Sequence, residues 1–247
     1  MKEVIYTIPL NEIYDTDCEC PLCELKSKLE TETVEYALGA AMMEPDFRIE
    51  SNEKGYCNRH FSMLFAGSNK LSLGLVLDTH LEKMREGLGK FSKEAAALGE
   101  EKGGLFKKNN AEAFSQKICS FLKTKEQSCI VCDKISKNMS RYIEILIEMW
   151  EDDMEFREKF EKSKGACLPH YQELVSVAAK KLNAKKAGEF IALLTKKQEE
   201  ELARIQADIH KFTLKFDYRN KDMEWGTAKD APIRTIEKIS GNILKKE

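Results

Sequence analysis

Long apolar runs and an excess of charge of one sign are both missing from this chain of 247 residues. The longest apolar stretch, near residues 71–77, is far shorter than the ~20 residues that a membrane-spanning helix needs. We therefore expect no membrane association. The net charge of −2 gives no general attraction for nucleic acid, so a nucleic-acid partner is not favoured. No apolar segment typical of a secretory signal opens the chain, and we expect a cytoplasmic location.

Proline is also scarce, with 5 residues, and no low-complexity segment interrupts the chain. Charged residues make up 33% and hydrophobic residues 42% of the sequence, a composition that indicates a soluble, helix-rich protein. Long segments rich in Leu, Glu, Lys and Ala, such as 24–43 and 134–160, predict helices. Only residues 3–8 alternate weakly, in a pattern compatible with a short strand. The expected fold class is all-α.

Cysteine is the residue type with an informative pattern. Six of the 8 cysteines fall in two matching arrangements. Each arrangement opens with C-x-x-C and closes with G-x-C-x-x-H, with about one long helix between the two motifs. The first contains Cys20, Cys23, Gly55, Cys57 and His60, and the second contains Cys129, Cys132, Gly165, Cys167 and His170.

The similarity extends beyond these residues. Cys23 precedes Phe47 by 24 positions, and Cys132 precedes Phe156 by the same 24. Self-similarity over such a period predicts a duplicated structural unit. The glycine-rich segment 99–104 is the clearest linker. We expect two pseudo-repeated helical halves, residues 1–99 and 105–247, the second with a C-terminal extension.

Three thiolates and one imidazole form a standard tetrahedral zinc set, with ligands at helix N-termini where the helix dipole favours the thiolate. We expect two zinc ions, one in each half. The predicted ligand sets are Cys20, Cys23, Cys57 and His60, and Cys129, Cys132, Cys167 and His170. An iron–sulfur cluster is less favoured because it usually takes four cysteines. Disulfides are disfavoured without a secretory signal, and a closed four-ligand site indicates a structural role.

Two arginines, Arg48 and Arg157, follow the two matching phenylalanines. They could form a pair of sites for an acidic ligand. The favoured alternative is that each arginine bonds carbonyl groups of the returning chain. Of the other two cysteines, Cys18 is expected to be a spare surface thiol. Cys119 lies on the apolar side of its predicted helix and is expected to be buried in the core.

The pattern resembles a bacterial family grouped as a domain of unknown function. The same resemblance extends to Phe216-Asp217-Tyr218-Arg219 and to the segment from Asp230-Ala231-Pro232 to Gly241. It covers nearly the whole chain. It implies duplicated metal-site motifs and no known activity.

We therefore expect a zinc-binding intracellular protein with a non-enzymatic interaction or regulatory role. The partner, a protein or a small molecule, is not specified by the sequence, nor is the oligomeric state. One alternative is an enzyme with a ligand pocket between the two halves. Another is a redox or metal sensor, in which oxidation opens a zinc–thiolate site.

Overall fold

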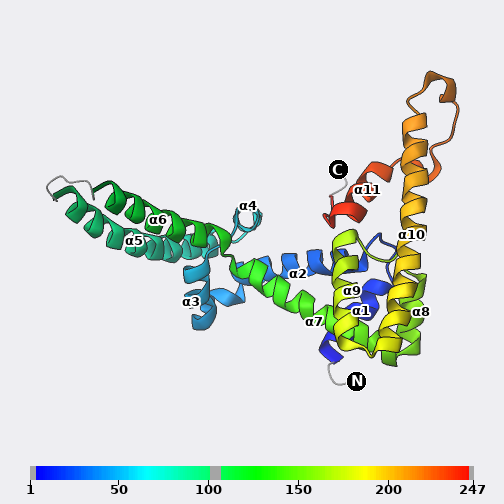
Figure 1. Ribbon diagram of the computed structural model, residues 1–247, viewed down its shortest axis with the longest axis horizontal. Coiled ribbons are helices and arrows are strands. Elements are labelled where there is room, and N and C mark those ends of the chain that lie inside the picture. The colour runs from blue at the N-terminus through cyan, green and yellow to red at the C-terminus, as the bar shows by residue number, and fades with distance from the viewer. Residues whose placement is uncertain (1–3, 101–106, 245–247) are drawn as a thin grey trace. The chain divides into compact units, whose positions relative to one another are not determined.

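The computed structural model describes residues 4–100 and 107–244, which form helices joined by short loops (Figure 1). The α-helices are α1 (Val4–Tyr14), α2 (Pro21–Leu38), α3 (Pro45–Lys54), α4 (Asn58–Ala66), α5 (Lys70–Glu100), α6 (Lys107–Gln127), α7 (Ile130–Asp152), α8 (Met154–Lys162), α9 (Leu168–Lys181), α10 (Ala184–Leu214) and α11 (Ala231–Ser240). Three 3-10 turns, η1 (Ala40–Met43), η2 (Tyr218–Asn220) and η3 (Gly226–Ala228), complete the order. The all-α expectation is confirmed.

The short strand expected at residues 3–8 is wrong, because the described part of that segment belongs to α1. Leu10 and Tyr14 are buried on one face of this helix, and Tyr6 lies four residues earlier on the same face. The Tyr6 ring meets Tyr142 edge-on at 5.0 Å, and the Tyr14 ring meets Phe156 at 5.2 Å. These three residues of α1 recur every four positions, as on one face of a helix, because they pack on distant residues. This packing overrides the weak local alternation that had suggested a strand.

The chain divides into two compact units. Unit 1 comprises residues 1–29 and 137–247, and unit 2 comprises residues 30–136. The division falls inside α2 and α7. It therefore does not follow the expected halves 1–99 and 105–247, and most of the predicted linker, residues 101–104, lies outside the described residues. No helix in 4–100 or 107–244 is long and apolar enough to cross a membrane.

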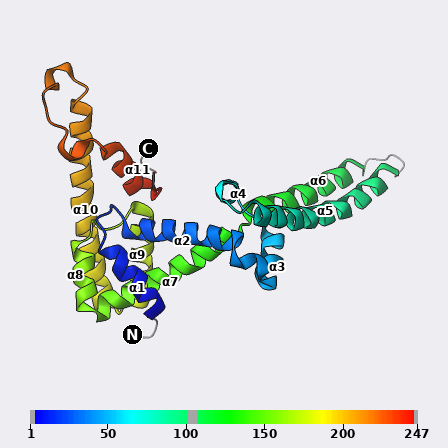
Figure 2. The ribbon, with the colours of Figure 1, turned by 180° about the vertical axis from the view of Figure 1, so that it is seen from behind.

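Unit 1 is built around an aromatic core where α7, α8 and α10 meet. Phe190 of α10 is fully buried, with ring centroids 4.9 Å from Trp150 and 5.5 Å from Phe160. Helix α10 also packs on α9 and α11, as both ribbon views show (Figure 1, Figure 2). This packing fixes the start of α9, where Cys167 and His170 lie.

Unit 2 contains the pair of helices α5 and α6, which run side by side (Figure 1). Their contact includes Phe91 of α5, whose ring lies 5.4 Å from that of Phe121 in α6. Helices α3 and α4 also pack against α5. Phe47 of α3 is buried and meets Tyr36 of α2 edge-on at 5.4 Å. The short helices α3 and α4 are thereby held on the α5 scaffold.

The glycine of each G-x-C-x-x-H motif has the same backbone conformation. Gly55 has a φ of +68° and Gly165 a φ of +76°. Residues with a Cβ rarely adopt this region, whereas glycine enters it at little cost. Each glycine redirects the chain after a short helix, α3 or α8, so that the following cysteine lies at the start of α4 or α9.

Candidate metal centres

The first Cys/His cluster, the α2–α9 cluster, lies within unit 1 and consists of Cys20, Cys23, Cys167 and His170. Cys20 directly precedes α2, and Cys23 lies in its first turn. Cys167 is the N-cap of α9, and its sulfur accepts a hydrogen bond from the backbone N–H of His170 at 3.5 Å. Two helix N-termini therefore converge on one point, where their dipoles favour negative charge.

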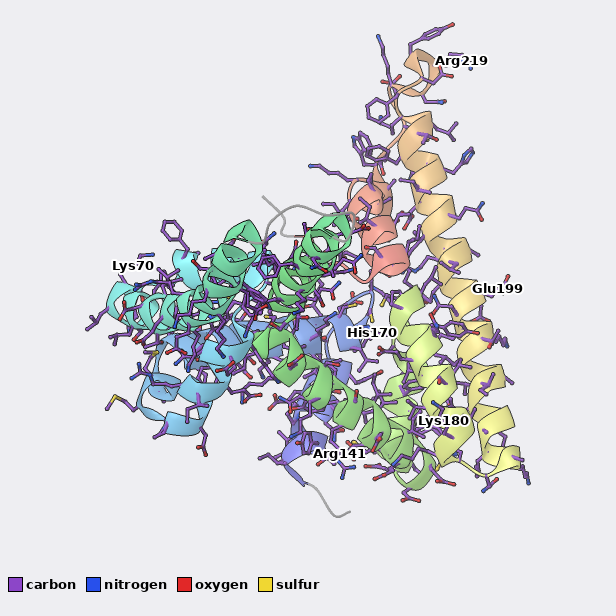
Figure 3. The ribbon with its side chains drawn as sticks, turned by 60° about the vertical axis from the view of Figure 1, so that its left-hand side comes forward. Lys70, Arg141, His170, Lys180, Glu199 and Arg219 are labelled. Atoms are coloured by element: carbon purple, nitrogen blue, oxygen red, sulfur yellow. The ribbon has the colours of Figure 1, made fainter. Side chains whose placement is uncertain are left out.

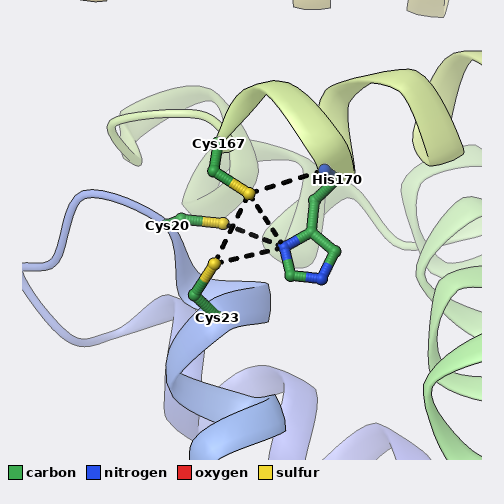
Figure 4. Close-up of side chains that lie close together, drawn as sticks. All are labelled: Cys20, Cys23, Cys167 and His170. Atoms are coloured by element: carbon green, nitrogen blue, oxygen red, sulfur yellow. Dashed lines mark hydrogen bonds between the residues drawn. The ribbon is translucent and has the colours of Figure 1, made fainter. Parts of the chain in front are cut away.

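The four side chains of the α2–α9 cluster point toward one another (Figure 4). The Nδ1 atom of His170 lies 3.4 Å from the sulfur of Cys20, 3.3 Å from that of Cys23 and 3.2 Å from that of Cys167. The sulfurs of Cys23 and Cys167 are 3.4 Å apart. All four residues are buried. A buried set of this kind needs a partner for its thiols and imidazole, because unpaired polar groups are costly away from water.

Proximity changes the acid–base behaviour of this cluster. Burial alone would lower the pKa of His170, but the thiols of Cys167 and Cys20 outweigh it and raise that pKa to about 10. The neighbouring Cys20 and Cys23 lower the pKa of Cys167, against the opposing effect of burial. The cluster therefore favours thiolate at Cys167. A metal ion bound through Nδ1 would replace the proton on the imidazole.

The second cluster, the α4–α7 cluster, lies within unit 2 and consists of Cys57, His60, Cys129 and Cys132. Cys57 is the N-cap of α4, and Cys129 directly precedes α7. The Nδ1 atom of His60 lies 3.2 Å from the sulfurs of Cys57 and Cys129 and 3.5 Å from that of Cys132. Cys132 is exposed and Cys57 half-buried. This cluster is open to solvent on its Cys132 side.

The second nitrogen of the His60 imidazole contacts a carboxylate. Its Nε2 atom lies 3.0 Å from Oε1 of Glu30, which also accepts from Nε of Arg59 at 2.8 Å. Burial alone would raise the pKa of Glu30, but Arg59 and His60 outweigh it and hold that pKa below its usual value. An ionised Glu30 fixes the tautomer with Nδ1 unprotonated, the form that a metal-ligating histidine takes through such a partner.

Both clusters have the dimensions of a tetrahedral metal site. Bond lengths of ~2.3 Å for Zn–S and ~2.0 Å for Zn–N imply edges of roughly 3.8 Å between sulfurs and roughly 3.5 Å between sulfur and nitrogen. The observed edges include 3.8 Å between Cys57 and Cys132 and 3.5 Å between Cys132 and His60. Other edges are slightly shorter, at 3.2–3.4 Å from His170 to its cysteines, 3.2 Å from His60 to Cys57 and Cys129, and 3.4 Å between the sulfurs of Cys23 and Cys167. In each cluster all ligand atoms lie within 4.8 Å of one another.

The structure brings together all eight expected ligands, but it pairs the motifs differently from the prediction. The expected grouping within each half is wrong. The first C-x-x-C meets the last C-x-x-H in the α2–α9 cluster, and the first C-x-x-H meets the second C-x-x-C in the α4–α7 cluster. Spacing shows which residues form a ligand pair, because the two members lie on one helical turn. It cannot show which pairs meet, because this depends on long-range packing.

The arrangement of these motifs can now be compared with known families. The chain matches the family of unknown function DUF6062 over residues 1–246. It belongs to the DUF6062 family. No curated protein and no solved structure matches the chain. The expected resemblance to a family of unknown function is confirmed, and this DUF6062 chain carries two Cys/His clusters that could hold metal ions.

The remaining residues singled out in the sequence lie away from the clusters or beside them. Cys119 is exposed, so its expected burial is wrong. Cys18 is half-buried, and burial raises its pKa to about 11. Arg157 donates to the carbonyl oxygens of Trp150 at 2.9 Å and Glu151 at 3.0 Å, which end α7. A ligand-binding role for Arg48 and Arg157 stays a prediction.

A network of charged side chains beside the α2–α9 cluster has no signature in the sequence. Glu19, which precedes Cys20, accepts from Arg204 of α10 at 2.6 Å and lies 3.6 Å from Arg234 of α11. Arg234 also pairs with Asp208 at 2.9 Å. This network borders a cleft of about 1020 Å³ in unit 1. In Figure 3, Arg219 lies beyond the end of α10, well away from His170, so this arginine of the segment Phe216-Asp217-Tyr218-Arg219 is not part of the cluster.

Proposed function

We propose that the protein binds two zinc ions, one in the α2–α9 cluster and one in the α4–α7 cluster. The observation that carries this proposal is that, in each cluster, three sulfurs and one Nδ1 atom face one another at the spacing of a tetrahedral site. The ligands would be Cys20, Cys23, Cys167 and His170 for one ion, and Cys57, His60, Cys129 and Cys132 for the other. Bound zinc would supply a rigid cross-link between helix N-termini.

The donor set favours zinc over an iron–sulfur cluster. Three thiolates and one imidazole are a common structural zinc set. Iron–sulfur clusters usually use four cysteines, and a histidine replaces cysteine in special cases. The sulfurs of Cys23 and Cys167, at 3.4 Å, are also well beyond the ~2.05 Å of a disulfide bond. The thiols are therefore free to act as metal ligands.

We propose further that both zinc ions are structural and that the protein has a non-enzymatic interaction or regulatory role in the cytoplasm. A site closed by four protein ligands leaves no position for a substrate or a water molecule. Eight free cysteines suit a reducing compartment, where thiols persist. The zinc ions would hold the helix starts in place, and the helical surfaces would then be available to a partner.

The order of helices supports a duplication of the chain. A helix, a long helix with a C-x-x-C start, a short helix, a helix with a C-x-x-H start and a second long helix follow one another in residues 4–100. The same order follows in 107–214. The last helices, α5 and α10, each contain 31 residues. In such a duplicated chain, the two copies exchange ligand pairs, so that each zinc site draws one pair from each copy.

Elemental analysis of protein purified without added metal tests the metal proposal. We expect two zinc ions per chain and no visible iron–sulfur absorbance. A stoichiometry near zero, or stoichiometric iron with an absorbance band in the visible region, would refute it. A measurable activity lost in ligand variants that remain folded would overturn the structural role.

One observation favours a sensor as a second candidate. Cys132 is exposed, and its sulfur lies 3.8 Å from that of Cys57. A peroxide could oxidise these two thiolates to a disulfide, releasing the ion, while the peroxide takes two protons and is reduced to water or alcohol. Zinc release on peroxide treatment, followed with a chromogenic chelator, tests this. Release of one ion that reductant reverses would support the sensor, and retention of both ions would exclude it.

A further inference from the structure

Helix α11 contains a lysine with no access to solvent. The side chain of Lys238 is fully buried, although lysine almost never is unless it is paired. Helix α11 packs on α9 and α10. A buried ammonium group needs both hydrogen-bond acceptors and nearby negative charge to offset its lost hydration. The groups around Lys238 therefore indicate its role.

The ammonium group of Lys238 joins the two segments that carry the ligands of the α2–α9 cluster. It donates to the carbonyl oxygen of Glu19 at 3.1 Å and to that of Lys164 at 2.5 Å. Glu19 directly precedes Cys20, and Lys164 lies three residues before Cys167. One side chain thereby ties the start of α2 to the approach to α9.

The α4–α7 cluster contains the same link, made by a different residue. Ser128 directly precedes Cys129, as Glu19 precedes Cys20. Lys54 lies three residues before Cys57, as Lys164 does before Cys167. The hydroxyl of Ser128 donates to the carbonyl oxygen of Lys54 at 2.5 Å. Both clusters thus have their ligand segments joined at matching positions, directly in one case and through Lys238 in the other.

The charge of Lys238 also suits its surroundings. Three thiolates, a neutral imidazole and a divalent ion carry a net charge of −1, and here that charge would be buried. Burial lowers the pKa of Lys238, while Glu19, Cys20 and Glu201 act in the opposite direction and Arg204 adds to the lowering. The carboxylate of Glu19 is directed at Arg204. The α4–α7 cluster, which is open to solvent at Cys132, can rely on water for the same purpose.

The end of α11 covers the sulfurs directly. The carbonyl oxygen of Gly241 lies 3.6 Å from the sulfur of Cys23. A Cβ atom at Gly241 would lie 3.0 Å from the sulfur of Cys167, closer than nearly all Cβ contacts. The same helix therefore places a positive charge behind the cluster and backbone over it.

We propose that Lys238 is a positioning residue of the α2–α9 metal site, which holds the segments 19–20 and 164–167 together and offsets the net negative charge of the metal-bound cluster. This inference rests on the proposed metal binding. It predicts a coupling between α11, far along the chain, and the metal affinity of one cluster only.

The test measures the two zinc affinities of the full chain by chelator competition, assigned with Cys167→Ser and Cys132→Ser. Lys238→Met should weaken the α2–α9 site about 10- to 100-fold, the range for partners that orient metal ligands, and leave the α4–α7 site unchanged. Lys238→Arg, which keeps the charge and donors, should recover part of the loss. Ser128→Ala should weaken the α4–α7 site instead.

A matched control separates this role from general loosening of the loop. Lys197→Met also removes a lysine bond to a loop carbonyl, that of Ser163 at 2.8 Å, and should leave both affinities unchanged. Equal affinities in Lys238→Met and the parent would refute the inference. If Lys238→Met does not fold, Lys238→Arg is compared with Lys197→Met instead. An equal loss of zinc affinity at the α2–α9 site in these two variants, relative to the parent, would refute the inference. A parent with fewer than two ions would instead refute the proposed function.

Discussion

The exchange of ligand pairs predicts an unusual pattern of metal loss in double variants. Cys20→Ser with Cys167→Ser disrupts the α2–α9 cluster alone, because both residues belong to it. Cys20→Ser with Cys57→Ser disrupts one ligand in each cluster. A serine hydroxyl is a poor zinc ligand, and the remaining cysteines and histidine cannot close a four-ligand site.

The expected metal content follows directly. The parent chain should hold two zinc ions, the first double variant one, and the second none. A structural zinc ion contributes an apparent ~10–16 kcal/mol to folding in small peptides, which is comparable to the ~5–15 kcal/mol stability of a typical domain. The first variant should therefore lose cooperative unfolding of unit 1 while unit 2 keeps its helices.

The assay is elemental analysis after gel filtration, with circular dichroism melts of each variant. Cys119→Ser is the matched control, because this exposed thiol lies outside both clusters, and it should keep two ions. The reverse pattern, with no ions in the first double variant and one in the second, would show that each half binds its own ion. That outcome would refute the observed pairing.

Three further predictions concern single side chains. Glu30→Gln should weaken the zinc affinity of the α4–α7 site about 10- to 100-fold, because the carboxylate orients His60; chelator competition measures this. Phe190→Ala should lower the free energy of unfolding by about 3–5 kcal/mol in urea titrations, because the ring is fully buried in the unit 1 core. Asp208 has a pKa held below its usual value, since the Thr227 hydroxyl and Arg234 outweigh burial. Its stabilising contribution is present above pH ~3.9 and is lost as the pH falls through the folded pKa, so the difference in melting temperature between Asp208→Asn and the parent should shrink below that pH.

Each of these has an outcome that would contradict it. Glu32→Gln changes an exposed glutamate of the same helix, and an equal loss of affinity there would remove the role given to Glu30. A loss below 1 kcal/mol in Phe190→Ala would show that the site collapses without a cavity. A melting difference for Asp208→Asn that is constant from pH 7 to pH 3 would exclude a titrating contribution.

The sequence predicted what is local in this protein. The C-x-x-C and C-x-x-H spacings identified ligand pairs, because two residues three apart share one turn at a helix start. Composition predicted the all-α class. The glycines that redirect the chain were part of the motif, and both have positive φ. These features depend on residues close together in the chain.

What the sequence did not predict depends on packing between distant residues. The pairing of Cys23 with Cys167 spans 144 positions, and nothing in the spacing distinguishes it from a pairing within one half. Glu30 and Lys238 support the clusters from other helices, without any motif of their own. Cys119 was expected in the core from its apolar neighbours, but on a helix these can face a different side.

The pairing also nests one closed loop of the chain inside another. Cys23 and Cys167 close the outer loop, and His60 and Cys129 close the inner loop of 69 positions. During translation, Cys132 is the last ligand of the inner cluster to be added. His170, which completes the outer cluster, follows 38 residues later. Doubling a loop costs only ~0.6 kcal/mol, so for the proposed zinc ions the order of synthesis, rather than loop entropy, would set the order of metal binding. The chain would take up its inner ion first, and Lys238 would seal the outer one only after a further 68 residues have followed His170.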